Sequence, residues 1–193
     1  MSEGISPSEP LRGLEAVRKT RGPAPVHLWN PPYCGEIDMR IAADGVWHYC
    51  GSPIGRPALV KLFASILRKD PERYVLVTPV ERVGIRVDDA PFLGVEMGVE
   101  KTDGGQILTF RTNVDDVVAV DPEHPLRFER GAAEGIKPYV RVRGGLWALV
   151  KRALYYDLVA LGAVEPWQGE DWFGVRSGAL FFPMTHASEI EGL

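Results

Sequence analysis

Apolar and polar residues alternate along several short stretches of the chain, a pattern typical of strands with one buried face. In residues 36–42, Ile37, Met39 and Ile41 alternate with charged side chains, and the Asp44-Gly45 step predicts a hairpin that returns through residues 46–50. We expect further strands at residues 74–79, 83–87, 91–97, 106–112, 116–120, 139–143, 172–177 and 179–183.

Helical spacing of apolar residues occurs in two other stretches. The first predicted helix follows Pro57, which suits a first helical position, and Pro71 ends it. Its apolar side chains fall on one stripe: Leu59, Leu62, Phe63, Ile66 and Leu67. A second helix is predicted from about Leu146 to Leu161, apolar on nearly all sides. A short helix with Ser8 as its cap is predicted over residues 8–20.

The sequence resembles itself when it is shifted by ninety residues. The stretch "RIAADGVWHY" (40–49) lies over "RGAAEGIKPY" (130–139), "GRPALVK" (55–61) over "GLWALVK" (145–151), and "ERVGIRV" (81–87) over "DWFGVRS" (171–177). We therefore predict an α+β fold of two duplicated units, each an antiparallel sheet packed on one main helix. The predicted divisions are an N-terminal helix and linker (1–28), a first repeat (29–97) and a second repeat (98–193).

Each copy carries a glycine-containing loop with arginine ahead of a predicted helix. Helix N-termini attract anions and glycine lets a ligand approach the backbone, so both loops are candidate anion sites. The alternative is a glycine turn that only starts a helix, since neither loop matches a phosphate-binding motif. The candidate ligand-binding residues are Ser52, Gly55 and Arg56, then Arg141, Arg143 and Gly145, with the duplicated Arg86 and Arg176 as a second tier.

Composition excludes several classes of function. The chain of 193 residues has a net charge of −4, which argues against nucleic-acid binding, and no apolar run long enough to span a membrane. Two cysteines without metal spacing fit reduced thiols in the cytoplasm. Basic residues nevertheless gather between Arg127 and Arg152, either as a solvated face or as a surface that steers an anionic partner.

No stretch has a catalytic or metal-binding signature. His27, His48, His124 and His186 lack ligand spacing, and the surroundings of Ser177 do not match a nucleophile elbow. We expect no metal, no cofactor and no catalytic residue, although Asp38 with His48 leaves a hydrolase open. Trp167 and Trp172 either pack a hairpin or form an exposed surface that docks a protein partner.

The stretches "WNPPYCGEIDMRIAADGVWHYCGSPIGR", "LVTPVE" (76–81) and "DAPF" (89–92) resemble the bacterial family known as domain of unknown function 1285, from about Trp29 onward. The resemblance implies a duplicated α+β structure whose C-terminal half is superficially like a pleckstrin-homology fold. It also implies a nucleotide-like ligand at the domain interface and a role in signal transduction, without catalytic residues.

We therefore expect a non-enzymatic cytoplasmic module that binds a small anionic, nucleotide-like ligand at the interface of two repeats. In this hypothesis Arg56 and Arg143 pair with the anion, because a guanidinium group matches phosphate geometry. The alternatives are a protein-interaction scaffold and a hydrolase. Nucleic acid and membrane are not expected as partners.

Overall fold

The computed structural model describes residues 11–14, 17, 24–131 and 135–190. Its internal contacts divide the chain into two compact units: unit 1 is Met1–Pro91 with Gly144–Leu146, and unit 2 is Phe92–Arg143 with Trp147–Leu193. The predicted boundary between residues 97 and 98 lies inside a strand of unit 2. Most of the predicted N-terminal helix (8–20) lies outside the described residues.

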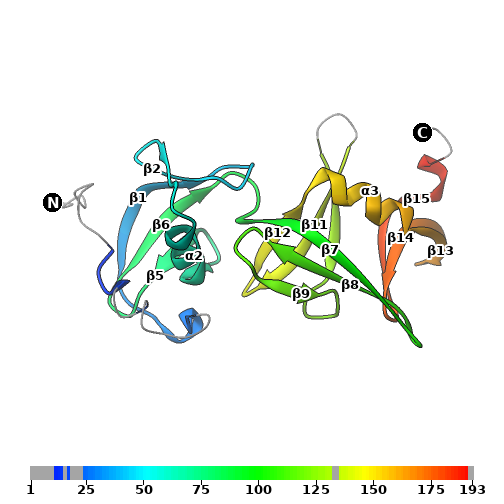
Figure 1. The fold of residues 1–193 in the computed structure, drawn as a ribbon, viewed down its shortest axis with the longest axis horizontal. Coiled ribbons are helices and arrows are strands. Elements are labelled where there is room, and N and C mark those ends of the chain that lie inside the picture. The colour runs from blue at the N-terminus through cyan, green and yellow to red at the C-terminus, as the bar shows by residue number, and fades with distance from the viewer. Residues whose placement is uncertain (1–10, 15–16, 18–23, 132–134, 191–193) are drawn as a thin grey trace. The chain divides into compact units, whose positions relative to one another are not determined.

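Unit 1 is built on a six-stranded sheet with the strand order β3-β2-β1-β6-β5-β4 (Figure 1). Neighbouring strands are antiparallel, except that β1 and β6 are parallel. The elements of the unit are η1 (Val26–Leu28), β1 (Tyr33–Ile41), β2 (Trp47–Tyr49), β3 (Ser52–Pro53), α2 (Pro57–Ser65), β4 (Leu67–Lys69), β5 (Tyr74–Val77) and β6 (Arg82–Val87).

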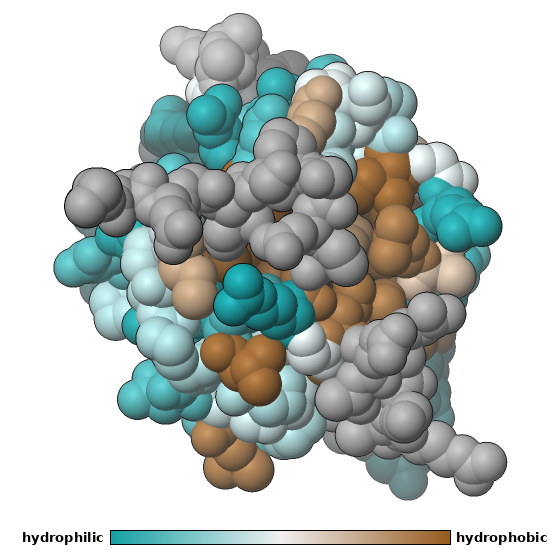
Figure 2. Space-filling model, turned by 90° about the vertical axis from the view of Figure 1, so that its left-hand side faces the viewer, coloured by the Kyte–Doolittle hydropathy of each residue, from teal (hydrophilic) through white to brown (hydrophobic). Residues whose placement is uncertain are grey.

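The helix α2 lies against one face of this sheet (Figure 1). Phe63 stacks on the buried Trp47 with ring centroids 6.2 Å apart, and Ile41, which is opposite Trp47 on β1, is fully buried. In Figure 2, apolar side chains gather to the right of the centre of the view. Val17 and Ala24 are buried as well, so the described part of the N-terminal segment contributes to a core.

The first predicted helix ends earlier than expected. Residues 67–69 form β4 and pair with β5, with Leu67 opposite Leu76. Arg68 therefore does not sit in a last helical turn; its guanidinium bonds Asp70 (2.7 Å) and the carbonyl of Trp29 (2.6 Å). Pairing with β5 gives the backbone N–H and C=O groups of residues 67–69 the hydrogen bonds that a longer helix would have made internally. The backbone is therefore satisfied in the strand as it would be in a helix.

Unit 2 has a six-stranded sheet of order β10-β11-β12-β7-β8-β9 and a three-stranded sheet of order β13-β14-β15 (Figure 1). In the larger sheet β12 and β7 are parallel. The elements are β7 (Phe92–Thr102), β8 (Gly105–Thr112), β9 (Val117–Ala119), β10 (Leu126–Arg130), β11 (Ile136–Arg143), β12 (Leu146–Val150), α3 (Arg152–Ala160), β13 (Ala163–Trp167), β14 (Glu170–Ser177), β15 (Leu180–His186) and η3 (Ala187–Glu189).

A buried serine joins the two sheets of unit 2. The hydroxyl of Ser177 donates to the carbonyl of Val120 (2.8 Å) and accepts from the N–H of Leu108 (3.1 Å). Apolar side chains of both sheets and of α3 are buried in the same unit: Phe92, Phe110, Val140, Leu158, Val175 and Phe182. Ser177 is thus a structural residue that holds the end of β14 against β8.

The second predicted helix is wrong in its first part. Residues 146–150 form β12, in which Leu146, Ala148 and Val150 are buried and alternate with half-buried Trp147 and Leu149. The helix α3 begins only at Arg152. The apolar run is compatible with a helix or a strand. It forms a strand here because it pairs with β11 on one side and with β7 on the other.

The two units fit a duplication in the order of their elements. Each contains a hairpin, a helix and a second hairpin: β1–β2, α2 and β5–β6 in unit 1, and β10–β11, α3 and β13–β14 in unit 2. The sheets are assembled differently, because β1 pairs with β6 whereas β10 and β14 lie in separate sheets. The molecule is a two-unit, sheet-rich protein.

Candidate functional site

The first predicted anion loop leads into an exposed helix start. Ser52 lies on β3, and Gly55 and Arg56 follow in the loop, all exposed. Arg56 is the N-cap of α2; no side chain caps this end and no acidic residue lies in the first turn. The N–H groups of Leu59 and Val60 both donate to the carbonyl of Arg56.

The N–H of Ala58 has no hydrogen-bond partner in the part of the chain that the structure describes. Pro57 has no N–H, and within the described residues no acceptor reaches the amide of Ala58. The Arg56 side chain makes no hydrogen bond or ion pair in the same part of the chain. The loop around Gly55 is open, since a Cβ there would meet no atom within 4 Å. The loop thus offers one free amide and one free guanidinium to solvent.

Arg86 lies on the sheet of unit 1 rather than on the loop. It is exposed and stands in register with Arg40, which forms an ion pair with Asp88 (3.0 Å). Arg40 is also opposite His48, so three basic side chains form a row across β6, β1 and β2.

The second predicted anion loop is a hairpin turn, not a helix start. Gly144 (φ 51°) and Gly145 (φ 78°) connect β11 to β12, and this pair of positive φ angles is the geometry of a tight hairpin turn. Arg141 and Arg143 share one face of β11, as predicted, while Val140 and Val142 are buried on the other. No helix N-terminus accompanies these two arginines, so the second loop lacks half of the expected anion site.

Arg143 already has a carboxylate partner. Its guanidinium pairs with Asp116 and lies over the ring of Phe92, 4.9 Å from the centroid. Asp116 precedes β9, far from Arg143 in the sequence, and no sequence pattern marks the pair. An anionic ligand at Arg143 would have to compete with this carboxylate.

Arg176 is held in the same way. Its Nε donates to both oxygens of Glu165 (2.7 and 2.9 Å), and its Nη1 donates to the carbonyl of Ala179 (2.9 Å). These hydrogen bonds lower the pKa of Glu165, so the carboxylate is ionised at neutral pH. No sequence pattern indicated Glu165 as the partner of Arg176, because the pairing of β13 with β14 brings the two side chains together.

The other predicted features have local partners too. In the basic stretch, Arg127 pairs with Glu129 (3.1 Å) and stacks on Trp147 (4.2 Å), whereas Arg141 has no ion pair in the described residues. Trp167 meets Trp172 edge to face at 5.5 Å in the β13–β14 hairpin, so the hairpin interpretation is confirmed.

In the described part of the chain, no group of three or more His, Cys, Asp or Glu side chains is placed to hold a metal ion. Cys34 and Cys50 are free and exposed. Asp38 and His48 lie on the neighbouring strands β1 and β2, and Arg40 rather than Asp38 is directly opposite His48.

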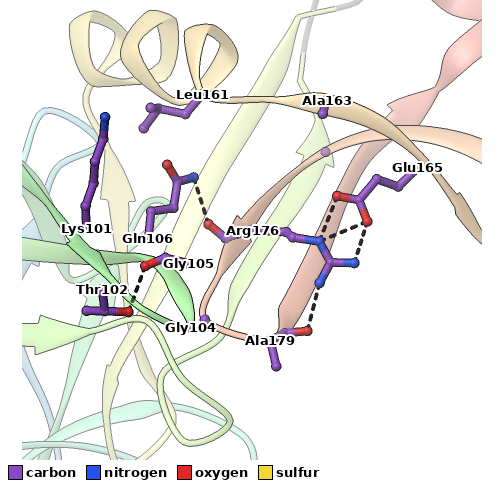
Figure 3. Close-up of a pocket in the computed structure, with 12 residues that line it drawn as sticks. Lys101, Thr102, Gly104, Gly105, Gln106, Leu161, Ala163, Glu165, Arg176 and Ala179 are labelled. Atoms are coloured by element: carbon purple, nitrogen blue, oxygen red, sulfur yellow. Dashed lines mark hydrogen bonds and ion pairs between the residues drawn. The ribbon is translucent and has the colours of Figure 1, made fainter.

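Unit 2 contains a pocket that no sequence pattern indicated. It has a volume of about 610 Å³ and lies among the β7–β8 hairpin, the end of α3 and the three-stranded sheet (Figure 3). Its lining includes Lys101, Gln106, Leu161, Ala163, Glu165 and Arg176. Of the predicted site residues, only Arg176 borders it.

Comparisons with known proteins agree with the resemblance seen in the sequence. Residues 24–90 match the N-terminal domain of the domain of unknown function DUF1285, and residues 91–184 match the C-terminal domain of the protein of unknown function DUF1285. No curated protein matches the chain. None of the helices in the described residues has the length and apolar character to cross a bilayer.

Two solved structures are similar to the chain. A DUF1285 family protein from Silicibacter pomeroyi DSS-3 is 50% identical with a TM-score of 0.85, over 93% of this chain and 98% of the other. A DUF1285 family protein from Shewanella baltica OS155 is 30% identical with a TM-score of 0.51, over 64% of this chain and 91% of the other. Since the two domain matches together span most of the sequence, this chain belongs to the DUF1285 family.

Proposed function

We propose that this protein is a module that binds a small anionic, nucleotide-like ligand and that the start of α2 supplies the principal contacts. The observation that carries the proposal is the uncapped, exposed helix start beside Arg56, whose side chain has no partner among the described residues. The nucleotide-like character, the signalling role and a pleckstrin-homology-like unit 2 belong to this proposal through the family resemblance. The cytoplasmic location belongs to it through the two cysteines, which fit reduced thiols.

The helix start favours negative charge for two physical reasons. The amides of a first helical turn carry a partial positive charge, and here no side-chain oxygen or acidic residue neutralises it. The guanidinium of Arg56 adds a full charge with donors in a planar fork that matches phosphate. The open space at Gly55 allows a phosphate to approach the backbone.

The remaining candidate residues differ in how available they are. Arg143 and Arg176 would each have to leave a carboxylate, Asp116 or Glu165, before binding a ligand. Arg56, Arg86 and Arg141 carry no such cost. The proposal therefore gives Arg56 the principal role, and the position of the ligand between the two repeats stays a prediction.

Calorimetric titration with AMP, GMP, ADP and GDP tests the proposal. We expect saturable binding by the wild type and about tenfold weaker binding by Arg56→Ala, the loss of one charge-assisted hydrogen bond. Lys61→Ala is the matched control, because it removes the same charge from the same helix. The proposal fails if the wild type binds none of the four nucleotides, or if Arg56→Ala binds as tightly as Lys61→Ala.

A further inference from the structure

The pocket of unit 2 is bordered on one side by two polar residues that the β7–β8 hairpin holds together. Lys101 and Gln106 are directly opposite each other in the antiparallel pairing. Cross-strand partners point to the same face, so both side chains project from the hairpin on the side of the pocket (Figure 3). The hairpin thus presents an ammonium group and an amide at adjacent positions.

Hydrogen bonds fix this hairpin to the three-stranded sheet. The side-chain amide nitrogen of Gln106 donates to the backbone carbonyl of Arg176 (3.0 Å). The backbone N–H of Gly178 donates to the backbone carbonyl of Gln106 (2.7 Å). A carbonyl can only accept, so the side-chain nitrogen of Gln106 must face Arg176. The side-chain oxygen of Gln106 then faces away from β14 and remains an acceptor for a ligand.

Charge in the pocket is not balanced. Glu165 and Arg176 neutralise each other through their hydrogen bonds on the side opposite Lys101 (Figure 3). Lys101 has no hydrogen bond or ion pair in the part of the chain that the structure describes. The pocket therefore offers one net positive charge, which a single carboxylate would complement.

The remaining wall gives the ligand an apolar part. Leu161 at the end of α3 and Ala163 at the start of β13 line the pocket between the two polar sides (Figure 3). A volume of about 610 Å³ is in the range of small-molecule sites. Apolar walls with a few fixed polar groups are the usual composition of such sites.

From these contacts we propose that unit 2 carries a binding site of its own for a small organic acid. Lys101 binds the carboxylate, the side-chain oxygen of Gln106 accepts a hydrogen bond from a neighbouring N–H or hydroxyl, and Leu161 with Ala163 contacts a short apolar body. N-acylated amino acids have this combination of groups. The site is separate from the start of α2 and does not depend on the function proposed there.

Nuclear magnetic resonance titration of the full chain with N-acetylleucine tests the site. The amides of Gly104, Gly105 and Gly178 line the pocket and report its occupancy. We expect these signals to shift saturably with N-acetylleucine and about tenfold more weakly with N-acetylleucinamide, which lacks the carboxylate. Lys101→Ala should weaken N-acetylleucine binding to the same degree.

Two further variants make the test specific. Ala163→Leu keeps the charge of Lys101 but enlarges a side chain that lines the pocket, so it should abolish the shifts. Lys61→Ala lies in unit 1 and should leave them unchanged. The proposed site is overturned if the glycine signals do not shift, if N-acetylleucinamide binds as well as N-acetylleucine, or if Lys101→Ala or Ala163→Leu binds like the wild type.

Discussion

Arginine side chains in this protein differ by whether a carboxylate lies within reach. Arg143 pairs with Asp116 and Arg176 with Glu165, whereas Arg56 has no ion pair among the described residues. Ion pairs that are partly exposed contribute little stability each, yet they occupy the donors that an anion would use. Availability to a ligand therefore depends on partners distant in sequence as much as on the arginine itself.

The Glu165–Arg176 pair gives a pH-dependent prediction at the residue scale. Hydrogen bonds from Arg176 lower the folded-state pKa of Glu165, so the pair stabilises the fold above the unfolded pKa of the carboxyl. This stabilisation is lost as the pH falls through the lowered pKa. We expect Glu165→Gln to unfold at a lower temperature than the wild type at pH 7, and the difference to be smaller at pH 3, below the pKa of about 4.3 that a glutamate has in an unfolded chain.

A matched variant isolates this effect. Glu72 also lies beside an arginine, Arg73, but 81% of its side chain is exposed. Glu72→Gln should therefore leave the unfolding temperature nearly unchanged at both pH values. Thermal unfolding followed by circular dichroism measures all three proteins, and a Glu165→Gln deficit that persists unchanged at pH 3 would contradict the argument.

Among the elements, a strand with alternating residues was predictable, whereas the apolar run at residues 146–150 was assigned to the wrong element. Alternation located β1, because a half-buried strand imposes a period of two on the sequence. Residues 146–150 read as part of an apolar helix, yet β12 lies between β11 and β7. A short apolar run fits either structure, and only the strands beside it decide.

The candidate site shows the same division between local and distant information. Its first loop was predictable, since Gly55, Arg56 and the start of α2 are contiguous in the sequence. Its second loop was not, because the strand assignment of residues 146–150 turns Gly144-Gly145 into a hairpin connection. The pocket of unit 2 combines three distant segments, so no sequence pattern could reveal it.

The hairpin between β11 and β12 allows a prediction at the element scale. Gly144 has φ 51° with no atom within 4 Å of an added Cβ, so Gly144→Ala tests backbone strain without a steric clash. We expect it to lower the free energy of unfolding by about 1 kcal/mol, the cost of the left-handed conformation for a residue with a Cβ. Urea denaturation measures the change.

Gly55 provides the control for this substitution. It has the same open surroundings, but its φ is not positive. Gly55→Ala should therefore change the free energy of unfolding by less than about 0.5 kcal/mol, as is usual for surface positions. Equal losses for Gly144→Ala and Gly55→Ala would show that the turn does not depend on glycine.

For the whole molecule, the repeat in the sequence corresponds to the order of elements but not to the assembly of the sheets. A shift of ninety residues places β6 on β14, and both units run from hairpin to helix to hairpin. In unit 1 the two hairpins share one sheet through the parallel pair β1 and β6. In unit 2 the strand β10 is at the edge of the six-stranded sheet and β14 lies in the three-stranded one, so the two hairpins belong to separate sheets, while the parallel pair of this unit joins β7 to β12.

The position of β7 leads to a prediction about where the chain can be divided. Phe92 at its start is fully buried, and residues 92–94 pair with Ala148, Leu149 and Val150 of β12. A fragment that begins at Phe92 keeps this strand in the middle of the sheet. A fragment that begins at residue 98, the boundary predicted from the sequence, lacks the part of β7 that pairs with β12 and leaves the edge of β12 unpaired.

We therefore expect residues 92–193 to fold alone and residues 98–193 to remain unfolded. The longer fragment has about 100 residues, an ordinary size for an independent domain, and retains the buried side chains of both sheets. Loss of a buried phenylalanine alone costs about 3–5 kcal/mol, a large part of the stability of such a domain. Dispersed amide signals and a cooperative thermal transition identify the folded fragment, and a shorter fragment that also showed both would place the boundary of unit 2 within β7.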